Sequence, residues 1–385
     1  MHRAVIGVLV HNEEPNIETC LRAILDESVD GISVGEVIVV SSGSTDRTED
    51  IVRRVASNDR RVRLVSEAKR NGKASALNLL LSKSAHPLVV LLGGDVVFTP
   101  GSLGRLLEPF EDPAVGMTGV RPIPTNARRG VMGNVVHVLW DMHHELSLSK
   151  PKLGEAIAFR RILQGIDTET LVDEAMLEQV VLRQGLRLQY VPSAIVRNHG
   201  PETLREFIDQ RTRIYRGHLD LAAVTGYRVS SMNASAAGRA AWNLVRRRVA
   251  LRYLMLAFCL EAAARTHARL THRGSRVRGG GVWTAIPSSK VVVEAGHVLR
   301  AHHDFFQRLQ IPGAAVRDGG RQISGGAVAL RIRQLIRSDD QISLSSEGLT
   351  VIFRGDVAAA EALFARLARE IRELKASHVI LPPMD

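Results

Sequence analysis

The predicted fold rests on one segment, Leu88-Val-Val-Leu-Leu-Gly-Gly-Asp-Val-Val-Phe-Thr-Pro100. Its short apolar run, rich in Val and bounded by Pro and Gly, is typical of a strand buried on both faces. The glycine pair then lets the backbone turn sharply where the strand ends. Asp95 is the first charge after that strand, at the edge where an open parallel sheet presents groups to ligands. The alternative is that Asp95 only caps the helix that begins near Pro100 or Ser102.

The first hundred residues alternate between strand and helix patterns. We expect strands at 4–10, 36–40, 62–65 and 88–92, and helices at 15–25, 47–56 and 73–81. Such alternation with short connections implies right-handed strand–helix–strand units, hence an α/β fold with a mainly parallel sheet and helices on both faces. The loops after the first, second and fourth strands carry the polar groups. We therefore expect these loops to share one edge of the sheet and to form the active site.

Composition limits the classes of partner. The chain has 385 residues, enough for two or three domains, and a formal net charge of +11. This charge suits phosphate-bearing ligands, an anionic membrane surface or nucleic acid. No aromatic stacking platform or known nucleic-acid module accompanies it, so we expect no nucleic-acid partner. Cys20 and Cys259 form neither a disulfide framework nor a zinc spacing.

The N-terminus predicts no signal peptide. Its apolar run, 4–10, stops at His11-Asn-Glu-Glu14, and no cleavage site of small residues follows. No stretch reaches the roughly 18 uncharged apolar residues of a membrane-spanning helix. We expect a cytoplasmic protein.

Seven short segments follow one another in order within residues 4–217. They are His11-Asn-Glu-Glu14, Ser41-Ser-Gly-Ser-Thr-Asp-Arg-Thr48, Gly72-Lys-Ala-Ser-Ala-Leu-Asn78, Gly93-Gly-Asp95, Gly154-Glu-Ala-Ile-Ala-Phe-Arg-Arg161, Asp173-Glu174 and Gln210-Arg-Thr-Arg213. This order resembles that of the family-2 glycosyltransferases with the Rossmann-like GT-A fold. The second and fourth segments stand at the family's Asp-Asp-Gly-Ser-Thr-Asp loop and Asp-x-Asp motif, and the last at its Gln-x-x-Arg-Trp motif. Each motif is weak alone, but the ordered set is specific.

The resemblance implies transfer of a hexosyl or N-acetylhexosaminyl group from a nucleotide-diphosphate donor to a hydroxyl acceptor, with inversion. A UDP-sugar is the favoured donor, and a glycan, a lipid or a small molecule is the acceptor, in glycan, polysaccharide or glycolipid biosynthesis. A divalent ion, Mg²⁺ or Mn²⁺, makes the diphosphate a better leaving group. Such ions prefer oxygen ligands, so Asp95 is the expected metal ligand. His199 is the second candidate ligand, or else only a hydrogen-bonding surface group.

The resemblance also implies the remaining site residues. The donor-binding candidates are Asn12, Glu13, Ser41, Ser42, Asp46, Lys73, Gln210, Arg211 and Arg213. Lys73 adds charge to a helix start that favours anions, or is simply a solvated lysine. Arg211, Arg213 and Arg216 suit phosphate oxygens, although the same spacing also makes an exposed basic face. We favour contact for Arg213.

The acidic pair Asp173-Glu174 and the helix expected at 125–150 are assigned to the catalytic base and the acceptor side. By register with the family's pair, Glu174 is the catalytic base and Asp173 caps the helix. Acceptor-side candidates are Trp140, Glu155 and Tyr215. In a helix expected at 125–150, His137, Trp140 and His144 share one face, which favours acceptor contact over a zinc site, since no Cys or matched carboxylate joins them.

Three residues depart from the family pattern. Ser41 or Ser42 replaces the uracil-reading Asp, Gly93 replaces the first acid of Asp-x-Asp, and Ile214 replaces the Trp beside Tyr215. The alternative function is therefore a non-catalytic nucleotide-sugar-binding protein with a degenerate GT-A site.

The chain changes character after Gly226. We expect one or two basic helices within 239–278, which either lie on an anionic membrane, at its cytoplasmic face, or pack as core helices. A glycine run at 279–281 marks a linker. Residues 291–385 predict a small α/β unit, with helices at 327–337 and 357–374 and paired strands at 342–344 and 349–353. Its order faintly resembles the second half of a diguanylate-cyclase (GGDEF) domain. The predicted domains are 1–225, 226–290 and 291–385.

Overall fold

The computed structural model describes residues 2–27, 32–168, 170, 172–271 and 290, together with the backbone of strands within 297–353. The chain divides into two compact units, Met1–Glu294 and Ala295–Asp385. The boundary lies close to the predicted start of the last domain. The helices that follow residue 226 belong to the first unit.

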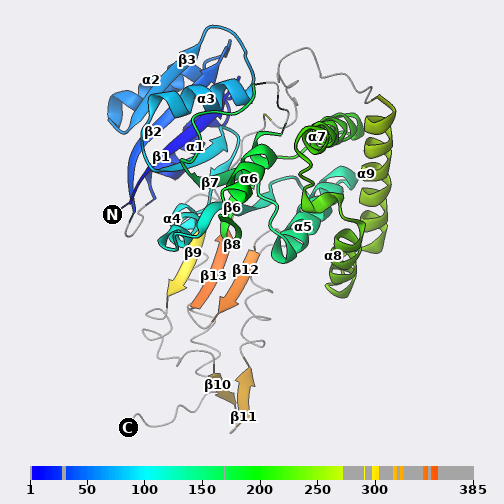
Figure 1. Cartoon of the computed structure of the whole chain (residues 1–385). Coiled ribbons are helices and arrows are strands. Elements are labelled where there is room, and N and C mark those ends of the chain that lie inside the picture. Colours follow the sequence, from blue (N-terminus) through cyan, green and yellow to red (C-terminus); the bar gives the residue numbers. More distant parts are fainter. Residues whose placement is uncertain are drawn as a thin grey trace. The chain divides into compact units, whose positions relative to one another are not determined.

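A mixed sheet organises the described part of the first unit (Figure 1). Its strands are β1 (His2–Val10), β2 (Ile32–Ser42), β3 (Val62–Glu67), β4 (Leu88–Gly93), β5 (Val97–Phe98), β6 (Val115–Pro124), β7 (Ala156–Arg160) and β8 (Arg187–Asn198), in the order β3-β2-β1-β4-β7-β6-β8-β5. The first four run parallel, as predicted. β7 enters antiparallel between β4 and β6, and β5 pairs antiparallel with β8. The sheet is therefore mostly but not wholly parallel.

Alternating residues of the central strands fill two cores, one on each face of the sheet. Val90 and Leu92 of β4 belong to the first core, and Val89 and Leu91 to the second. The first core is covered by α1 (Ile17–Leu25), α2 (Thr48–Asn58) and α4 (Ser102–Leu107), and the second by α3 (Lys73–Lys83) and α6 (Asp173–Arg183). The prediction of helices on both faces is confirmed. The run of apolar residues in β4 is explained by burial on both sides.

Two local expectations change in the structure. The helix expected at 125–150 is α5 (Val131–Ser149), because β6 continues to Pro124 and the chain then stays bound to the end of β8. Thr125 N–H donates to the Asn198 carbonyl at 2.8 Å. The N-cap of α4 is Gly101, so Asp95 does not cap that helix.

A helical layer packs beside the sheet, formed by α5, α7 (Leu204–Thr225), α8 (Ala234–Arg246) and α9 (Leu251–Thr271) (Figure 1). Val135 of α5, Phe207 of α7, Leu244 of α8 and Leu254 of α9 share one core cluster. Both basic helices therefore pack on the domain through one face. Within the described residues, no helix has the length and apolar character needed to cross a membrane.

The second unit is described only by its strands. β12 (Gln341–Ser345) pairs antiparallel with β13 (Gly348–Phe353), which pairs antiparallel with β9 (His297–His302), while β10 (Ala315–Asp318) and β11 (Arg321–Ser324) pair antiparallel with each other in a separate sheet. The predicted pairing of 342–344 with 349–353 is confirmed. The predicted helices at 327–337 and 357–374 and the glycine run at 279–281 lie outside the described residues.

Candidate functional site

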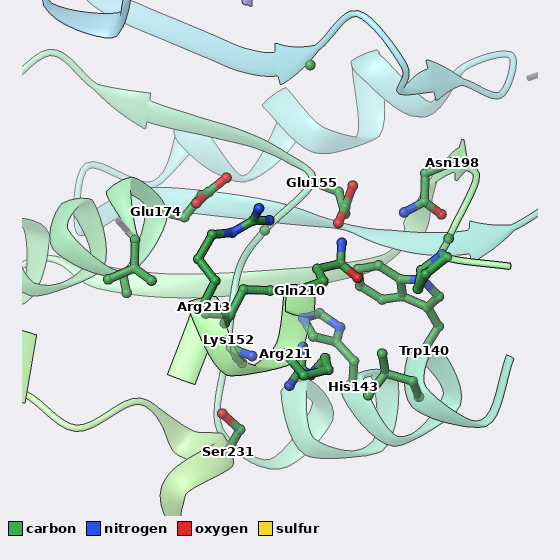
Figure 2. Close-up of a pocket in the computed structure, with 18 of the residues that line it drawn as sticks. Trp140, His143, Lys152, Glu155, Glu174, Asn198, Gln210, Arg211, Arg213 and Ser231 are labelled. Carbon is green, nitrogen blue, oxygen red and sulfur yellow. The ribbon is translucent and has the colours of Figure 1, made fainter. Parts of the chain in front are cut away.

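A cavity of about 570 Å³ opens where β1, β2 and β4 end. His11 and Glu13 from the loop after β1, Ser42 at the end of β2 and Asp95 after β4 line one side of it. Side chains of α5, α7 and α9 line the other side (Figure 2). The loops that the strand pattern assigned to one edge of the sheet do come together there.

The cavity collects most of the predicted site residues. Those that line it are Glu13, Ser42, Lys73, Asp95, Trp140, Glu155, Glu174, His199, Gln210, Arg211 and Arg213. Those that do not are Asn12, Ser41, Asp46, Asp173 and Tyr215. No ligand tests their individual roles, so these stay predictions.

Three of the residues outside the lining hold the loops after β1 and β2 together. Asn12 Oδ1 accepts from the Thr45 N–H at 2.8 Å, with Asn12 itself in a left-handed conformation at φ 54°. Asp46 accepts from the backbone N–H of Thr48 at 3.0 Å and of Glu14 at 3.1 Å. The buried Ser41 donates to Ser44 Oγ at 3.0 Å. These contacts shape the wall of the cavity.

Lys73 joins the acidic pair at the start of α6. It forms ion pairs with Asp173, at 3.2 Å, and with Glu174. The Asp173 side chain is 2% exposed and the Glu174 side chain 20%, and only Glu174 reaches the cavity. Lys73 is therefore not a simply solvated lysine, and its predicted contact with the donor stays a prediction.

Asp173 and Glu174 share one lysine, and their different contacts with it and with each other give the two carboxyl groups different pKa values. Burial opposes ionisation of Glu174, but the charge and hydrogen bond of Lys73 lower its pKa below the usual range. Burial, followed by the neighbouring Glu174 charge, raises the pKa of Asp173 to about 7. Glu174 is thus the carboxylate that is ionised at neutral pH and faces the cavity.

Other carboxylates surround Asp95. Burial and then the Asp95 charge raise the pKa of Glu13 to about 8 and that of Glu155 to about 7. Glu155 holds a left-handed backbone, φ 61°, which is unfavourable for a residue with a side chain. A Cβ added at Gly93 would lie 2.6 Å from Asp95 Oδ1. The carboxylate of Asp95 therefore occupies the space that a first acid of the motif would need.

This donor set fits a divalent cation that takes further ligands from a substrate. Within the described residues, no three His, Cys, Asp or Glu side chains converge closely enough to hold a metal by themselves. Mg²⁺ commonly takes one or two carboxylates, with phosphate oxygens and water as the other ligands. Besides burial, the charge of Asp95 raises the pKa of Glu13, which already pairs with Lys290, and that of Glu155, and a cation beside Asp95 would offset this charge. Asp95 would be its carboxylate ligand.

The histidines of this region already have partners. His199 Nδ1 lies 2.9 Å from Thr125 Oγ1, and its Nε2 lies 3.0 Å from Glu202 Oε1, so it must release one partner to bind a metal. His137 Nε2 lies 2.9 Å from the Asn126 carbonyl, and His144 Nδ1 lies 2.9 Å from the Tyr190 hydroxyl. These contacts explain the two histidines of α5 without zinc.

The arginines of α7 have different surroundings. Arg211 forms an ion pair with Glu261 of α9 at 2.7 Å, and Arg216 donates to Thr271. Burial, followed by the nearby Arg70 charge, lowers the pKa of Arg213 to about 10. Both Arg70 and Arg213 line the cavity, whereas Tyr215 packs under α9.

Several lining residues had no signal in the sequence. They include His11, Arg70, His143, Lys152, Asn198 and Lys290, whose ammonium pairs with Glu13. None stands at a family motif position that names its residue type. Their presence in the cavity depends on how α5, α7 and the loops pack.

Comparisons with known proteins bear on the family of this chain. The family model described as "Glycosyl transferase family 2" matches residues 5–161. The succinoglycan biosynthesis protein ExoU of Rhizobium meliloti is 28% identical over 242 residues, which cover 57% of this chain and 70% of that protein. An N-acetylglucosaminyltransferase of the same organism is 25% identical, and the match covers 52% of each chain. This chain thus spans about half the length of that relative.

Among solved structures, one comparison bears on the fold. The mannosyltransferase PcManGT from Pyrobaculum calidifontis, in complex with GDP-Man and Mn²⁺, superposes with a TM-score of 0.52 at 23% identity. The superposition covers 70% of this chain and 86% of that one. The comparisons do not show a diguanylate-cyclase relationship for the last segment.

Proposed function

Because the N-terminal region of this chain belongs to glycosyltransferase family 2 and has the GT-A fold, we propose that it transfers a sugar from a nucleotide-diphosphate donor to a hydroxyl acceptor, with inversion. A UDP-sugar is the proposed donor, and the transferred group is a hexosyl or N-acetylhexosaminyl unit. The names of the two rhizobial relatives support a role in polysaccharide or related glycan synthesis.

One observation carries the proposal. Asp95 and the ionised Glu174 line the same cavity, between the loops at the ends of the parallel strands and the helical layer. A donor diphosphate near Asp95 and Arg213 would place its sugar between the donor loops and Glu174. An acceptor can then enter from the side of α5 and α9.

The proposed reaction is a single displacement. The acceptor oxygen attacks the anomeric carbon, its proton passes to the Glu174 carboxylate, and the bond from that carbon to the diphosphate oxygen breaks with the electron pair leaving on the nucleotide. Arg213 offsets charge on the leaving diphosphate through its guanidinium. A divalent ion, when bound at Asp95, supplies further neutralisation of that charge.

A panel of nucleotides and nucleotide sugars, with and without Mn²⁺, tests this proposal by thermal shift. We expect a rise in the unfolding temperature with UDP or GDP ligands that requires the metal, because ligands that bind the native state stabilise it. If no nucleotide or nucleotide sugar gives a metal-dependent shift, the proposal of a nucleotide-sugar donor is contradicted.

The second candidate function is a nucleotide-sugar-binding protein without turnover. Ser41 turns its hydroxyl to Ser44 inside the protein, and Gly93 supplies no carboxylate. Binding of a nucleotide sugar without transfer to any hydroxyl acceptor would favour this function. Release of nucleoside diphosphate that depends on an acceptor would exclude it.

We also propose peripheral contact between α8–α9 and an anionic membrane surface. Trp242, Leu251 and Met255 are 63%, 60% and 55% exposed, beside exposed arginines. Apolar side chains flanked by basic ones suit the interface of such a membrane.

Substitution of Arg246, Arg248 and Arg252 by Gln is expected to reduce flotation with anionic liposomes, each arginine contributing about 1 kcal/mol near the surface. Arg247 stays in place because it pairs with the buried Glu145 at 2.7 Å. Raised salt should mimic the substitution, since the Debye length falls from about 10 Å at 0.1 M to about 3 Å at 1 M.

The matched control replaces three exposed arginines of α1 and α2, Arg22, Arg53 and Arg54, by Gln. It changes the net charge equally at a different surface and should float like the parent. Equal recovery of parent and α8–α9 variant in the soluble fraction at low salt would contradict membrane contact.

A further inference from the structure

The end of the cavity between α5, α7 and α9 carries a cluster of basic side chains that the transfer reaction does not use. Lys152, His143 and His218 line it together with Arg211 and Arg265. Figure 2 shows Lys152, His143 and Arg211 close together below Gln210. We call this part of the cavity the basic pocket.

The two arginines of the basic pocket share one acid. Glu261 accepts from Arg211 Nε at 2.7 Å and from Arg265 Nε at 2.8 Å. Glu178 also lies nearby, but it accepts from the Leu153 N–H at 2.6 Å and from the Tyr227 hydroxyl at 2.8 Å. With Lys152, three cations thus face one ionised carboxylate, Glu261, and a second carboxyl group, Glu178, whose pKa burial raises to about 7.

Lys152 has no counterpart of this kind. Within the described residues, its ammonium forms neither an ion pair nor a hydrogen bond. His143 Nδ1 is likewise buried without a hydrogen-bond partner there, and the polar neighbour of its ring is the Lys152 backbone. An ammonium and a ring nitrogen in a cavity wall, neither with a protein acceptor or donor there, can both take hydrogen bonds from a ligand.

Apolar side chains of two neighbouring helices also line the cavity. Leu139, Met142 and Leu146 of α5 and Leu254, Ala257 and Phe258 of α9 line it. A ligand here would meet positive charge on one side and hydrocarbon on the other.

We propose that the basic pocket binds the phosphate group of a phosphate-bearing acceptor, with Lys152 as the main contact and the acceptor's apolar part against α5 and α9. A phosphate dianion suits the surplus of positive charge left after Glu261 is paired, and its several oxygens can accept from Lys152 and His143 together. This inference rests on the proposed function and names the class of its acceptor.

The position of the basic pocket suits an acceptor. Leu153, next to Lys152, is held by Glu178, which lies one turn after Glu174 on α6. Four residues of an α-helix rise about 6 Å. An acceptor can therefore place its hydroxyl at Glu174 and its phosphate at Lys152.

Hexyl phosphate, inorganic phosphate and hexanol are the probes for the full chain, titrated by calorimetry near neutral pH. The titrations are run with and without a saturating nucleoside diphosphate and Mn²⁺, which keeps the donor side occupied. We expect hexyl phosphate to bind more tightly than inorganic phosphate, and hexanol not to bind. Equal affinity for the two phosphates would overturn the apolar half of the proposal and indicate a free phosphate site.

Lys152→Met should weaken hexyl phosphate binding by about ten- to a hundredfold, the usual effect of losing a charge-assisted hydrogen bond. Lys150→Met is the matched control, because Lys150 is exposed two residues earlier. Both variants should bind nucleotide and Mn²⁺ like the parent and unfold at its temperature or above.

The affinity should also depend on pH in a way that a structural lysine would not produce. Burial, followed by the Arg211 charge, lowers the pKa of Lys152 to about 8. Lys152 is charged below this pKa and neutral above it, so binding should weaken above about pH 8 rather than near 10.4. Glu178, whose pKa burial raises to about 7, acts in the same direction, while Arg211 and Glu261, which lie beside Arg265, keep their charges and His143 and His218 stay neutral.

The Lys152→Arg variant distinguishes the titration of Lys152 from that of the neighbouring groups. It should keep the affinity near pH 7 and remove most of the fall above pH 8, since a guanidinium stays charged. Binding of hexyl phosphate by Lys152→Met as tightly as by the parent would overturn the inference, as would an equal loss in Lys150→Met. Nucleotide binding without phosphate binding overturns this inference alone, whereas phosphate binding without nucleotide binding overturns only the donor assignment.

Discussion

Glu174→Gln is expected to reduce turnover by about 10²–10⁴-fold while leaving donor affinity unchanged. The amide cannot take the acceptor proton, yet it preserves the size of the side chain. Lys73 keeps its second partner, Asp173, at 3.2 Å, so the start of α6 should stay folded. Initial rates and nucleotide affinity, measured on the same preparation, check both halves of the expectation.

Asp173→Asn is the matched control for this carboxylate. Asp173 is buried and outside the cavity lining, so its loss should affect stability in urea more than the rate. The opposite pattern would make Asp173 the base. If neither variant slows transfer, the base lies elsewhere, and Glu155, with its pKa near 7, is the next carboxylate in the cavity to test.

Asp95→Ala is expected to abolish the metal dependence of donor binding, with a loss of about a hundredfold in affinity when Mn²⁺ is present. The fold should remain intact, because Asp95 raises the pKa of Glu13 and Glu155 and its removal relieves that repulsion. Nucleotide titrations in Mn²⁺ and in chelator measure the difference directly.

Asp50→Ala is the control for Asp95, since Asp50 lies exposed on α2, 76% accessible, away from the cavity. It should bind nucleotide and metal like the parent. If the Asp95→Ala variant still binds nucleotide more tightly with Mn²⁺, Asp95 is not the metal ligand and the metal binds elsewhere.

The sequence alone located the donor side of the site. The strands at 4–10 and 88–92 are short apolar runs that end at polar or glycine residues. Such runs are typical of strands of a parallel sheet that is buried on both faces. Parallel neighbours end at one edge, so Glu13, Ser42 and Asp95 had to meet there. The order of the motifs indicated the glycosyltransferase family, and the family-model match over residues 5–161 supports this.

Local patterns failed where a neighbour far along the chain sets the outcome. The helix expected from residue 125 begins at Val131, because β8 holds Thr125 in an extended conformation. The donor contacts predicted for Ser41 and Asp46 stay predictions, and in the folded loops their side chains bond to the nearby Ser44 and Thr48.

Only the tertiary structure shows which charged side chains form ion pairs with one another. Lys73 meets Asp173 and Glu174 about a hundred residues later, and Arg211 meets Glu261 across α7 and α9. Lys152 lines the cavity and has no such partner among the residues that the structure describes. Hydrophobic periodicity specifies which face of a helix is buried, but it does not specify which charged side chain of another element lies opposite. Strand positions and the edge of the site therefore follow from the sequence, whereas the protonation of Glu174 and the basic pocket depend on how α6, α7 and α9 pack.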